Sequence, residues 1–170
     1  ITQSIGIPSL SSIYEIDISP TGESIVLSGQ HGMQSDIFLY DLNSGDLRAL
    51  TDDSFADMQP RFSADGSRIV FSSRRIRNGE SERYGYFANL SFDIFEYRLE
   101  EAQLYRLSFE DFDCTMPFYA PDGKVVFLSS RDDIANLEIV DPLLGQIATL
   151  TRLISGVFNA DLSSDGNYLL

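Results

Sequence analysis

The chain has 170 residues, 43% of them hydrophobic, which is enough apolar material for a packed core. Its 26 acidic and 12 basic residues give a formal net charge of −14. That charge argues against general nucleic-acid binding and against docking on anionic lipid, because both need a basic surface. No apolar run approaches the roughly 20 residues that cross a bilayer, and no targeting signal is visible, so we expect no direct membrane insertion.

Four segments share a turn pattern that ends in Asp-Gly or Thr-Gly. They read IDISPTG (16–22), PRFSADG (60–66), PFYAPDG (117–123) and ADLSSDG (160–166), with glycines 44, 57 and 43 residues apart. An apolar run follows each one, at 25–27, 69–71, 125–128 and 169–170. Because glycine accepts a positive φ without steric cost, each segment predicts a hairpin between two strands, a and b.

A second pattern repeats in phase with the first. It reads DIFLYDLNSGDLRALT from Asp36, DIFEYRLEEAQLYRLS from Asp93 and NLEIVDPLLGQIATLT from Asn136. The final Thr or Ser lies 15 residues after the first residue in every copy, so Thr51, Ser108 and Thr151 match. Each copy predicts two further strands, c and d, and no segment shows a sustained helical period.

Strands b and c are apolar on both faces, as in the run from Ile37 to Tyr40. Such strands indicate sheets that stack against neighbours on both sides, which is typical of β-propeller blades. We therefore predict an all-β fold, a partial β-propeller built of four-stranded antiparallel blades. An N-terminal segment (1–12) precedes an arc over 13–170, with blades at 13–56, 57–113 and 114–157 and a truncated blade at 158–170.

The motifs of the chain follow the order Ser-x-Asp-Gly, an apolar strand, Ser-x-Arg, DIFLYDL and Leu-Thr. In this order the chain resembles the TolB-like branch of the WD40-like propeller repeats over roughly 13–170. The chain departs from WD-type repeats because it has no Trp and one His. The first copy also departs, with Thr21 in place of Asp and Gly29-Gln30 where later copies have Ser73-Arg74 and Ser130-Arg131. The resemblance implies a periplasmic or extracellular protein that binds other proteins at one mouth of the ring.

Three blades and the start of a fourth do not close a ring, because closed propellers have about four to eight blades. The end blades are expected to leave an apolar face uncovered, which favours association. The missing blades are then supplied by a larger polypeptide or by an assembly, unless the chain is a truncated piece.

In an a-b-c-d meander the b–c loops and the d-to-a loops share one end of the blade, and loops on rigid scaffolds often carry function. The b–c loop of blade two is the most distinctive, because it concentrates arginine and aromatic residues, which are enriched where proteins meet partners. The candidate partner-binding residues are Arg74, Arg75, Arg77, Arg83, Tyr84, Tyr86, Phe87, Asp53, Asp57, Asp111, Asp113 and Arg131. The alternatives are that this loop plugs the channel mouth, or that these arginines only pair with nearby aspartates.

No catalytic or metal-binding motif is found, and we expect no enzyme activity and no cofactor within this segment. The chain lacks a Gly-x-Ser-x-Gly elbow and a His-Glu-x-x-His helix, and His31 and Cys114 are single residues of their kinds. The carboxylates of the acidic loops are of a type that binds calcium, but the EF-hand spacing is absent. The expected function is a non-enzymatic interaction or scaffold domain. The alternatives are a propeller that accompanies a peptidase, and a channel that binds a small ligand or sugar.

Overall fold

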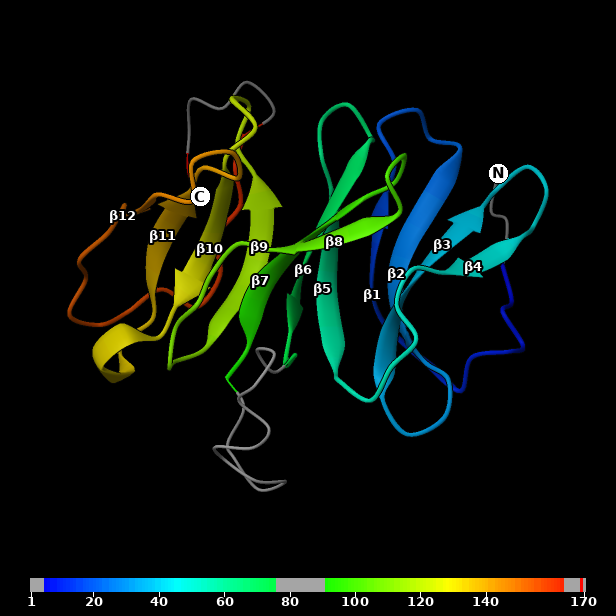
Figure 1. The fold of residues 1–170 in the computed structure, drawn as a ribbon, viewed down its shortest axis with the longest axis horizontal. Coiled ribbons are helices and arrows are strands. Elements are labelled where there is room, and N and C mark those ends of the chain that lie inside the picture. Colours follow the sequence, from blue (N-terminus) through cyan, green and yellow to red (C-terminus); the bar gives the residue numbers. More distant parts are fainter. Residues whose placement is uncertain (1–4, 76–90, 164–168, 170) are drawn as a thin grey trace.

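The computed structural model describes residues 5–75, 91–163 and 169, which form three four-stranded antiparallel sheets (Figure 1). Blade one contains β1 (Ser12–Ile18), β2 (Ser24–Gln30), β3 (Ser35–Asp41) and β4 (Leu47–Ala49). Blade two contains β5 (Asp57–Phe62), β6 (Arg68–Ser73), β7 (Asp93–Arg98) and β8 (Gln103–Arg106). Blade three contains β9 (Cys114–Tyr119), β10 (Val125–Ser129), β11 (Asn136–Val140) and β12 (Ile147–Thr149). Strands adjacent in sequence are adjacent in each sheet, which confirms the predicted all-β fold of four-stranded antiparallel blades.

The predicted Asp-Gly turns join the first two strands of a blade. In blade two, the amide of Gly66 donates to the carbonyl oxygen of Ser63 at 2.9 Å, and Gly66 has a φ of 73°. The carboxylate of Asp65 accepts from the Ser63 hydroxyl at 2.6 Å and from the amide of Ser67 at 3.0 Å. The bond from Ser63 is the largest cause that lowers the pKa of Asp65 to about 2. The turn is thus closed by side chains as well as by the backbone.

The constant 15-residue distance has a structural cause, because a side-chain latch joins the start of strand c to the end of strand d. In blade one, Thr51 Oγ1 accepts from the amide of Ile37 at 2.9 Å and donates to Asp36 Oδ1 at 3.4 Å. Asp36 Oδ1 also accepts from the amide of Asp53 at 3.3 Å. In blade two, Ser108 Oγ accepts from the amide of Ile94 and donates to Asp93, which also accepts from the amide of Glu110. In blade three, Thr151 Oγ1 accepts from the amide of Leu137 and donates to Asn136, which also accepts from the amide of Leu153.

Apolar side chains fill the two spaces between the blades, which explains why the sequence is apolar on both strand faces. The first cluster joins blades one and two through Val26, Ile37, Leu50, Phe62, Ile69, Phe71 and Phe95. The second joins blades two and three through Val70, Ile94, Leu107, Cys114, Val125, Phe127 and Val140. Burying a side chain of this size stabilises a fold by about 1.5–3 kcal/mol, so the two clusters are the main attraction between blades.

A polar contact also links blade two to blade three along their first strands. Gln59 has a φ of 60°, and its Oε1 atom accepts from the Ser72 hydroxyl at 3.0 Å. The same oxygen accepts from the amide of Met116 in the next blade at 2.8 Å, and Met116 has a φ of 53°. One side chain thereby satisfies a backbone amide that the bulge in β9 leaves without a strand partner.

The strand register corrects one equivalence between the repeats. On sequence alone, Arg74 matches Arg131. In the structure, Ser73 and Ser129 both end strand b and both pair with the first residue of strand c. Arg75 is therefore the counterpart of Arg131, because each lies two residues beyond the equivalent serine.

The outer face of blade one is apolar and uncovered in the described part of the chain. Tyr14, Ile16 and Ile18 alternate along β1, and they are 50%, 53% and 57% exposed. Alternate residues of a strand share one face, so these three form an apolar stripe directed away from blade two. Residues 5–11, the described residues before β1, form no strand, although the amide of Ser11 donates to the carbonyl oxygen of Gln30 at 2.9 Å.

Candidate functional site at the loop end

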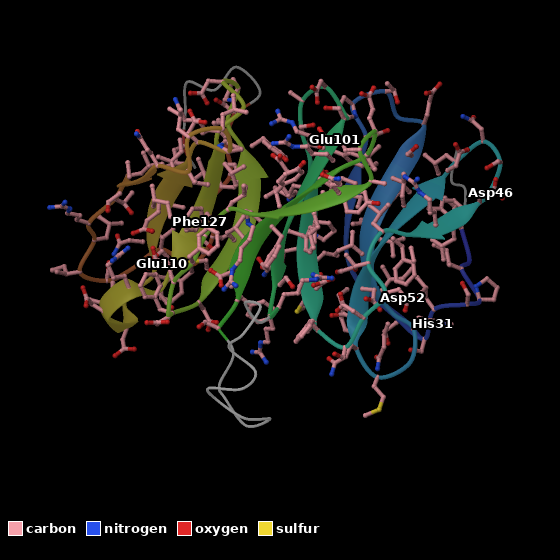
Figure 2. All side chains as sticks on the ribbon, in the orientation of Figure 1. His31, Asp46, Asp52, Glu101, Glu110 and Phe127 are labelled. Atoms are coloured by element: carbon pink, nitrogen blue, oxygen red, sulfur yellow. The ribbon has the colours of Figure 1, made fainter. Side chains whose placement is uncertain are left out.

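The loops and the tight turns lie at opposite ends of the sheets. Figure 2 shows Asp52 and Glu110, from the d-to-a loops, at the same end as His31 from a b–c loop. It shows Asp46 and Glu101, from the c–d turns, at the other end. The end that carries the b–c and d-to-a loops is called the loop end from here on.

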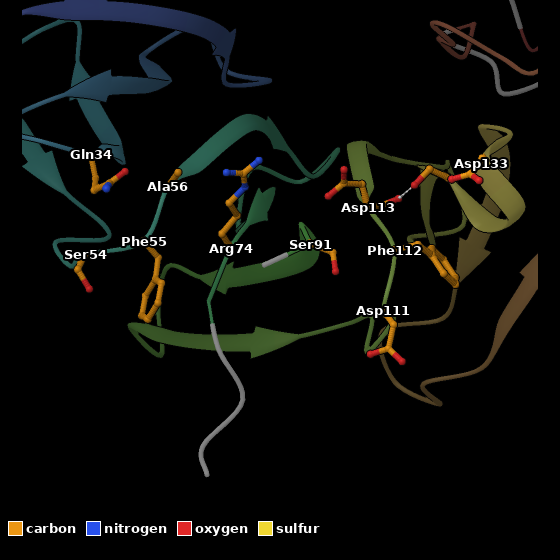
Figure 3. Close-up of a pocket in the computed structure, with 11 residues that line it drawn as sticks. Gln34, Ser54, Phe55, Ala56, Arg74, Ser91, Asp111, Phe112, Asp113 and Asp133 are labelled. Carbon is orange, nitrogen blue, oxygen red and sulfur yellow. Dashed lines mark hydrogen bonds between the residues drawn. The ribbon is translucent and has the colours of Figure 1, made fainter. Parts of the chain in front are cut away.

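A hollow of about 700 Å³ opens at the loop end, and residues of all three blades line it (Figure 3). Gln34 comes from the first b–c loop, Arg74 from the second and Asp133 from the third. Phe55 and Phe112 come from the two connections between blades. Charged, amide and aromatic groups therefore meet at one surface, although they are far apart in the sequence.

Hydrogen bonds across the blade boundary fix the walls of this hollow. The guanidinium of Arg74 lies 4.4 Å from the ring centroid of Phe92, and the amide of Phe92 donates to Asp113 Oδ1 at 2.8 Å. The carbonyl oxygen of Asp113 accepts from the amide of Ser130 at 2.9 Å and from its hydroxyl at 3.2 Å. The strands that carry these residues pack in the apolar clusters, so the surface is held in one shape.

Arg75 differs from its neighbour Arg74, because its side chain turns inward and is 11% exposed. Its Nη2 atom lies 2.8 Å from Asp57 Oδ2 and 2.6 Å from Asp53 Oδ2, and Nη1 contacts Asp57 Oδ1. Nη1 also donates to the Ser73 hydroxyl at 2.7 Å. This bidentate pair joins the start of β5 to the loop that arrives from blade one. Arg75, Asp53 and Asp57 therefore hold the loops together beneath the surface.

Three carboxylates approach one another beside Arg75. Oxygens of Asp36, Asp53 and Asp57 lie within 4.8 Å of one another, the spacing of a group that could hold a cation. Burial raises the pKa of Asp57, and the Arg75 guanidinium opposes that rise. Burial also raises the pKa of Asp36 to about 6, helped by the charges of Asp57 and Asp53. The single positive charge of the Arg75 guanidinium already contacts two of the three carboxylates, so a calcium ion would compete with it for Asp53 and Asp57. The expectation of no cofactor stays a prediction.

Arg131, the counterpart of Arg75, pairs with different carboxylates. Its Nη2 atom lies 3.2 Å from Glu138 Oε1 and 3.8 Å from Glu110 Oε1. The guanidinium also lies 4.7 Å from the ring centroid of Phe112, and the side chain is 51% exposed. In blade three Cys114 stands where blade two has Asp57, so the acidic partner moves from strand a to strand c.

Sequence reasoning missed one buried ion pair at this end. Arg106 contacts Asp93 through Nη2, and its Nε atom donates to the carbonyl oxygen of Ser108 at 3.1 Å. The aligned repeats contain the signal, because Asp93 and Arg106 occur together, whereas blade three has the neutral residues Asn136 and Thr149 at the same two positions.

The predicted partner-binding residues thus separate into three groups. Arg74, Asp111 and Asp113 line the hollow at the loop end, and Arg131 lies beside it. Asp53, Asp57 and Arg75 form the inward-facing ion-pair network. The remaining residues, Arg77, Arg83, Tyr84, Tyr86 and Phe87, lie outside the described residues.

The groups that suggest catalysis by their residue type are not assembled in the described part of the chain. His31 Nδ1 lies 2.9 Å from the carbonyl oxygen of Ser9, and the hydroxyl of Ser28 donates to Glu15. Cys114 is fully buried, and burial raises the pKa of its thiol to about 12. Over the described residues, no helix has both the length and the apolar character needed to cross a membrane.

Comparison with known proteins places the fold. No protein-family model and no curated protein matches the chain. TolB from Acinetobacter baumannii superposes with a TM-score of 0.75 at 23% identity, over 93% of this chain and 37% of that chain. A putative TolB from Agrobacterium tumefaciens superposes with a TM-score of 0.72 at 18% identity, over 95% of this chain and 65% of that chain. A prolyl endopeptidase structure superposes with a TM-score of 0.64 at 13% identity, over 95% of this chain and 26% of that chain.

The chain therefore spans about a third to two thirds of the TolB structures that it matches. At these identities the likeness concerns the fold. Three consecutive four-stranded antiparallel blades and the superpositions together show that the chain has the fold of a TolB-like β-propeller.

Proposed function

We propose that the chain is a non-enzymatic propeller segment that binds a protein partner at its loop end. The observation that carries the proposal is the hollow of about 700 Å³, which is lined by loops from all three blades. Its lining combines Arg74, Phe55 and Phe112 with Asp111 and Asp133, the mixture of aromatic rings and charges found where proteins meet. A surface preorganised in this way binds with a smaller ordering cost than a flexible loop.

Ion pairs beneath and beside the hollow support this proposal. Arg75 joins Asp57 to Asp53, and Arg131 joins Glu138 to Glu110, so each pair spans the connection between two blades. These contacts fix the positions of the connecting loops, from which Phe55 and Phe112 project. A scaffold function needs such fixed loops, whereas it needs no acid, base or nucleophile. The resemblance to TolB-like propellers supports a location in the periplasm or outside the cell as part of this proposal.

A site-specific photo-crosslinking experiment in the intact protein tests this proposal. The photoreactive amino acid p-benzoylphenylalanine is placed at Ser54 or Asp111, beside the hollow, and in a matched control at Asp46, on a tight turn at the opposite end. We expect one defined protein adduct from the first two positions and none from Asp46. A second change, Arg74→Glu, should weaken those adducts. Adducts of equal strength from both ends, or none from the loop end, would refute the proposal.

A second candidate function follows from the likeness to a prolyl endopeptidase, which extends over 95% of this chain. Under this alternative the propeller accompanies a peptidase domain elsewhere in the protein, and the hollow faces the path of the substrate. A fluorophosphonate probe of serine hydrolases separates the two candidates. Labelling of the intact protein at a residue outside this chain favours the peptidase, and lack of labelling together with loop-end adducts favours the scaffold. A thermal-shift screen of sugars and divalent ions tests the small-ligand alternative.

A further inference from the structure

A second hollow lies on blade three, at the outer side of the loop end. Its volume is about 390 Å³, and it is called the blade-three recess here. It is lined by Ser129, Arg131, Glu138, Thr149, Leu153 and Ile154, among others. The recess shares no lining residue with the hollow described above, so the inference drawn from it does not rest on the proposed function.

Two residues that line the recess each carry a buried polar atom with no hydrogen-bond partner within the described structure. These atoms are Ser129 Oγ and Glu138 Oε2, and the Glu138 side chain is 4% exposed. The other oxygen of that carboxylate, Oε1, is held by Arg131 at 3.2 Å. A buried charged oxygen without a donor is strongly unfavourable, so a ligand that supplies a donor there is favoured.

The other repeats show what fills this position elsewhere. In blade two, Arg106 pairs with Phe95 across strands c and d, as Thr149 pairs with Glu138 in blade three. The guanidinium of Arg106 lies 5.7 Å from the ring centroid of Phe95 and binds Asp93. Blade two therefore fills the space with a cation from its own strand d. Blade three has the short Thr149 there and has a carboxylate in place of the ring.

We propose that the blade-three recess binds a guanidinium or ammonium group carried on an aliphatic stem. The head group donates to Glu138 Oε2 and contacts Ser129 Oγ, in the place that Arg106 occupies in blade two. The stem lies along Leu153 and Ile154, whose side chains are 50% and 97% exposed at the rim. Arginine and lysine side chains have this form, with an apolar stem and a donor-bearing end.

The charges around the recess favour a cation. Its lining contains Arg131 and Arg152 together with Asp132 and Glu138, and Glu110 contacts Arg131 from the preceding blade. Three carboxylates thus surround two guanidiniums, and a bound cation brings the group to neutrality.

NMR titration of the ¹⁵N-labelled protein with n-butylguanidinium tests the proposal, with n-butylurea as the neutral control of the same shape. We expect saturable shifts of the Thr149 and Leu153 amide signals with n-butylguanidinium and at least tenfold weaker binding of n-butylurea. The amides of Leu143 and Leu144, on the opposite turn, should not shift. A blocked Gly-Arg-Gly peptide, compared with its citrulline counterpart, shows whether the bound cation comes from a partner protein or from a small molecule. Tighter binding of the arginine peptide indicates a partner's side chain, and its exclusion indicates a free small cation.

Two variants test whether the cation binds in the blade-three recess. Thr149→Arg restores the residue of blade two at an exposed position, so its own guanidinium should fill the recess and weaken n-butylguanidinium binding at least tenfold. Glu138→Gln removes the charge at nearly constant volume and should weaken binding about tenfold. Glu101→Gln, on the far turn, is the matched control and should leave binding unchanged. Equal binding of the two probes, or unchanged binding in Thr149→Arg, overturns the proposal and leaves the recess as a site for water alone.

Discussion

Asp36 carries a buried negative charge. At the corresponding position, blade two has a carboxylate paired with an arginine and blade three has a neutral residue. In blade two the equivalent Asp93 binds Arg106, and in blade three the equivalent residue is the neutral Asn136. Asp36 is 5% exposed, Ala49 stands where blade two has Arg106, and no described residue supplies such a cation. Burial raises the pKa of Asp36 from 3.8 to about 6. We therefore predict that Asp36→Asn stabilises the protein at neutral pH.

The magnitude follows from the pKa. A rise from 3.8 to about 6 means that the folded protein disfavours the charged carboxylate by about 3 kcal/mol. Asparagine keeps an Oδ1 acceptor for Thr51 and for the amide of Asp53, as Asn136 accepts in blade three at 2.9 and 2.8 Å. Its bonds are weaker than those of a charged acceptor, so we expect a net gain of about 1–2 kcal/mol. For a chain of this length that gain raises Tm by roughly 2–8 °C.

Urea unfolding of both proteins between pH 3 and pH 8 provides the measurement. The folded state binds the extra proton more tightly than the unfolded state, so protonation of Asp36 stabilises the wild type as the pH falls. The advantage of Asp36→Asn is therefore fully present above pH 6, shrinks as the pH falls below 6, and is absent below the unfolded pKa of 3.8. Groups far from Asp36 titrate alike in both proteins, so the difference reports Asp36 together with the charges coupled to it, those of Asp57, Asp53 and Asp52.

Asp93→Asn is the matched control, because the same substitution there removes the partner of a buried arginine. We expect it to destabilise the protein by about 2 kcal/mol or more at pH 7.5. No gain from Asp36→Asn at pH 7.5, or a gain of the same size at pH 3, would refute the assignment of an unpaired buried charge.

Two further predictions concern the contacts between blades. Asp57→Asn removes the fully buried partner of Arg75 and should lower the free energy of unfolding by about 3–5 kcal/mol in urea, whereas the exposed Asp122→Asn should change it by less than about 0.5 kcal/mol. Equal effects at the two sites would contradict the paired role of Asp57. Gln59→Leu leaves the amide of Met116 without its acceptor and should cost about 1–3 kcal/mol, together with faster hydrogen exchange of that amide. An unchanged exchange rate would show that another group accepts this bond.

The local parts of the fold were predictable from the sequence because they depend on neighbours in the chain. The turn at Gly66 needs a positive φ and a nearby acceptor, and the residues 63–66 provide both. The latch between Asp36 and Thr51 has a fixed length, because two antiparallel strands and one short turn separate its ends. Such features recur at a constant spacing, and the spacing was visible without any structure.

The candidate site was predictable only in outline. The order of strands placed the b–c and d-to-a loops at one end, and Arg74, Asp111 and Asp113 do line the hollow there. Sequence alone did not separate Arg74 from Arg75, because two adjacent arginines differ only in the direction of their side chains. That direction depends on where β6 ends and on the carboxylate of Asp57, which binds the Arg75 side chain.

The secondary structure, the blade repeat and the end of the molecule at which the loops gather can be derived from the order of the amino acids, since short-range chain geometry controls all three. Which charges are paired depends instead on how the blades pack against one another. Glu96 is fully buried with Arg68 at 3.4 Å and Arg98 at 2.9 Å, whereas one oxygen of Glu138 has no hydrogen-bond partner among the described residues. Ion pairs form over a few ångströms between residues that are many positions apart, and no periodicity records that distance.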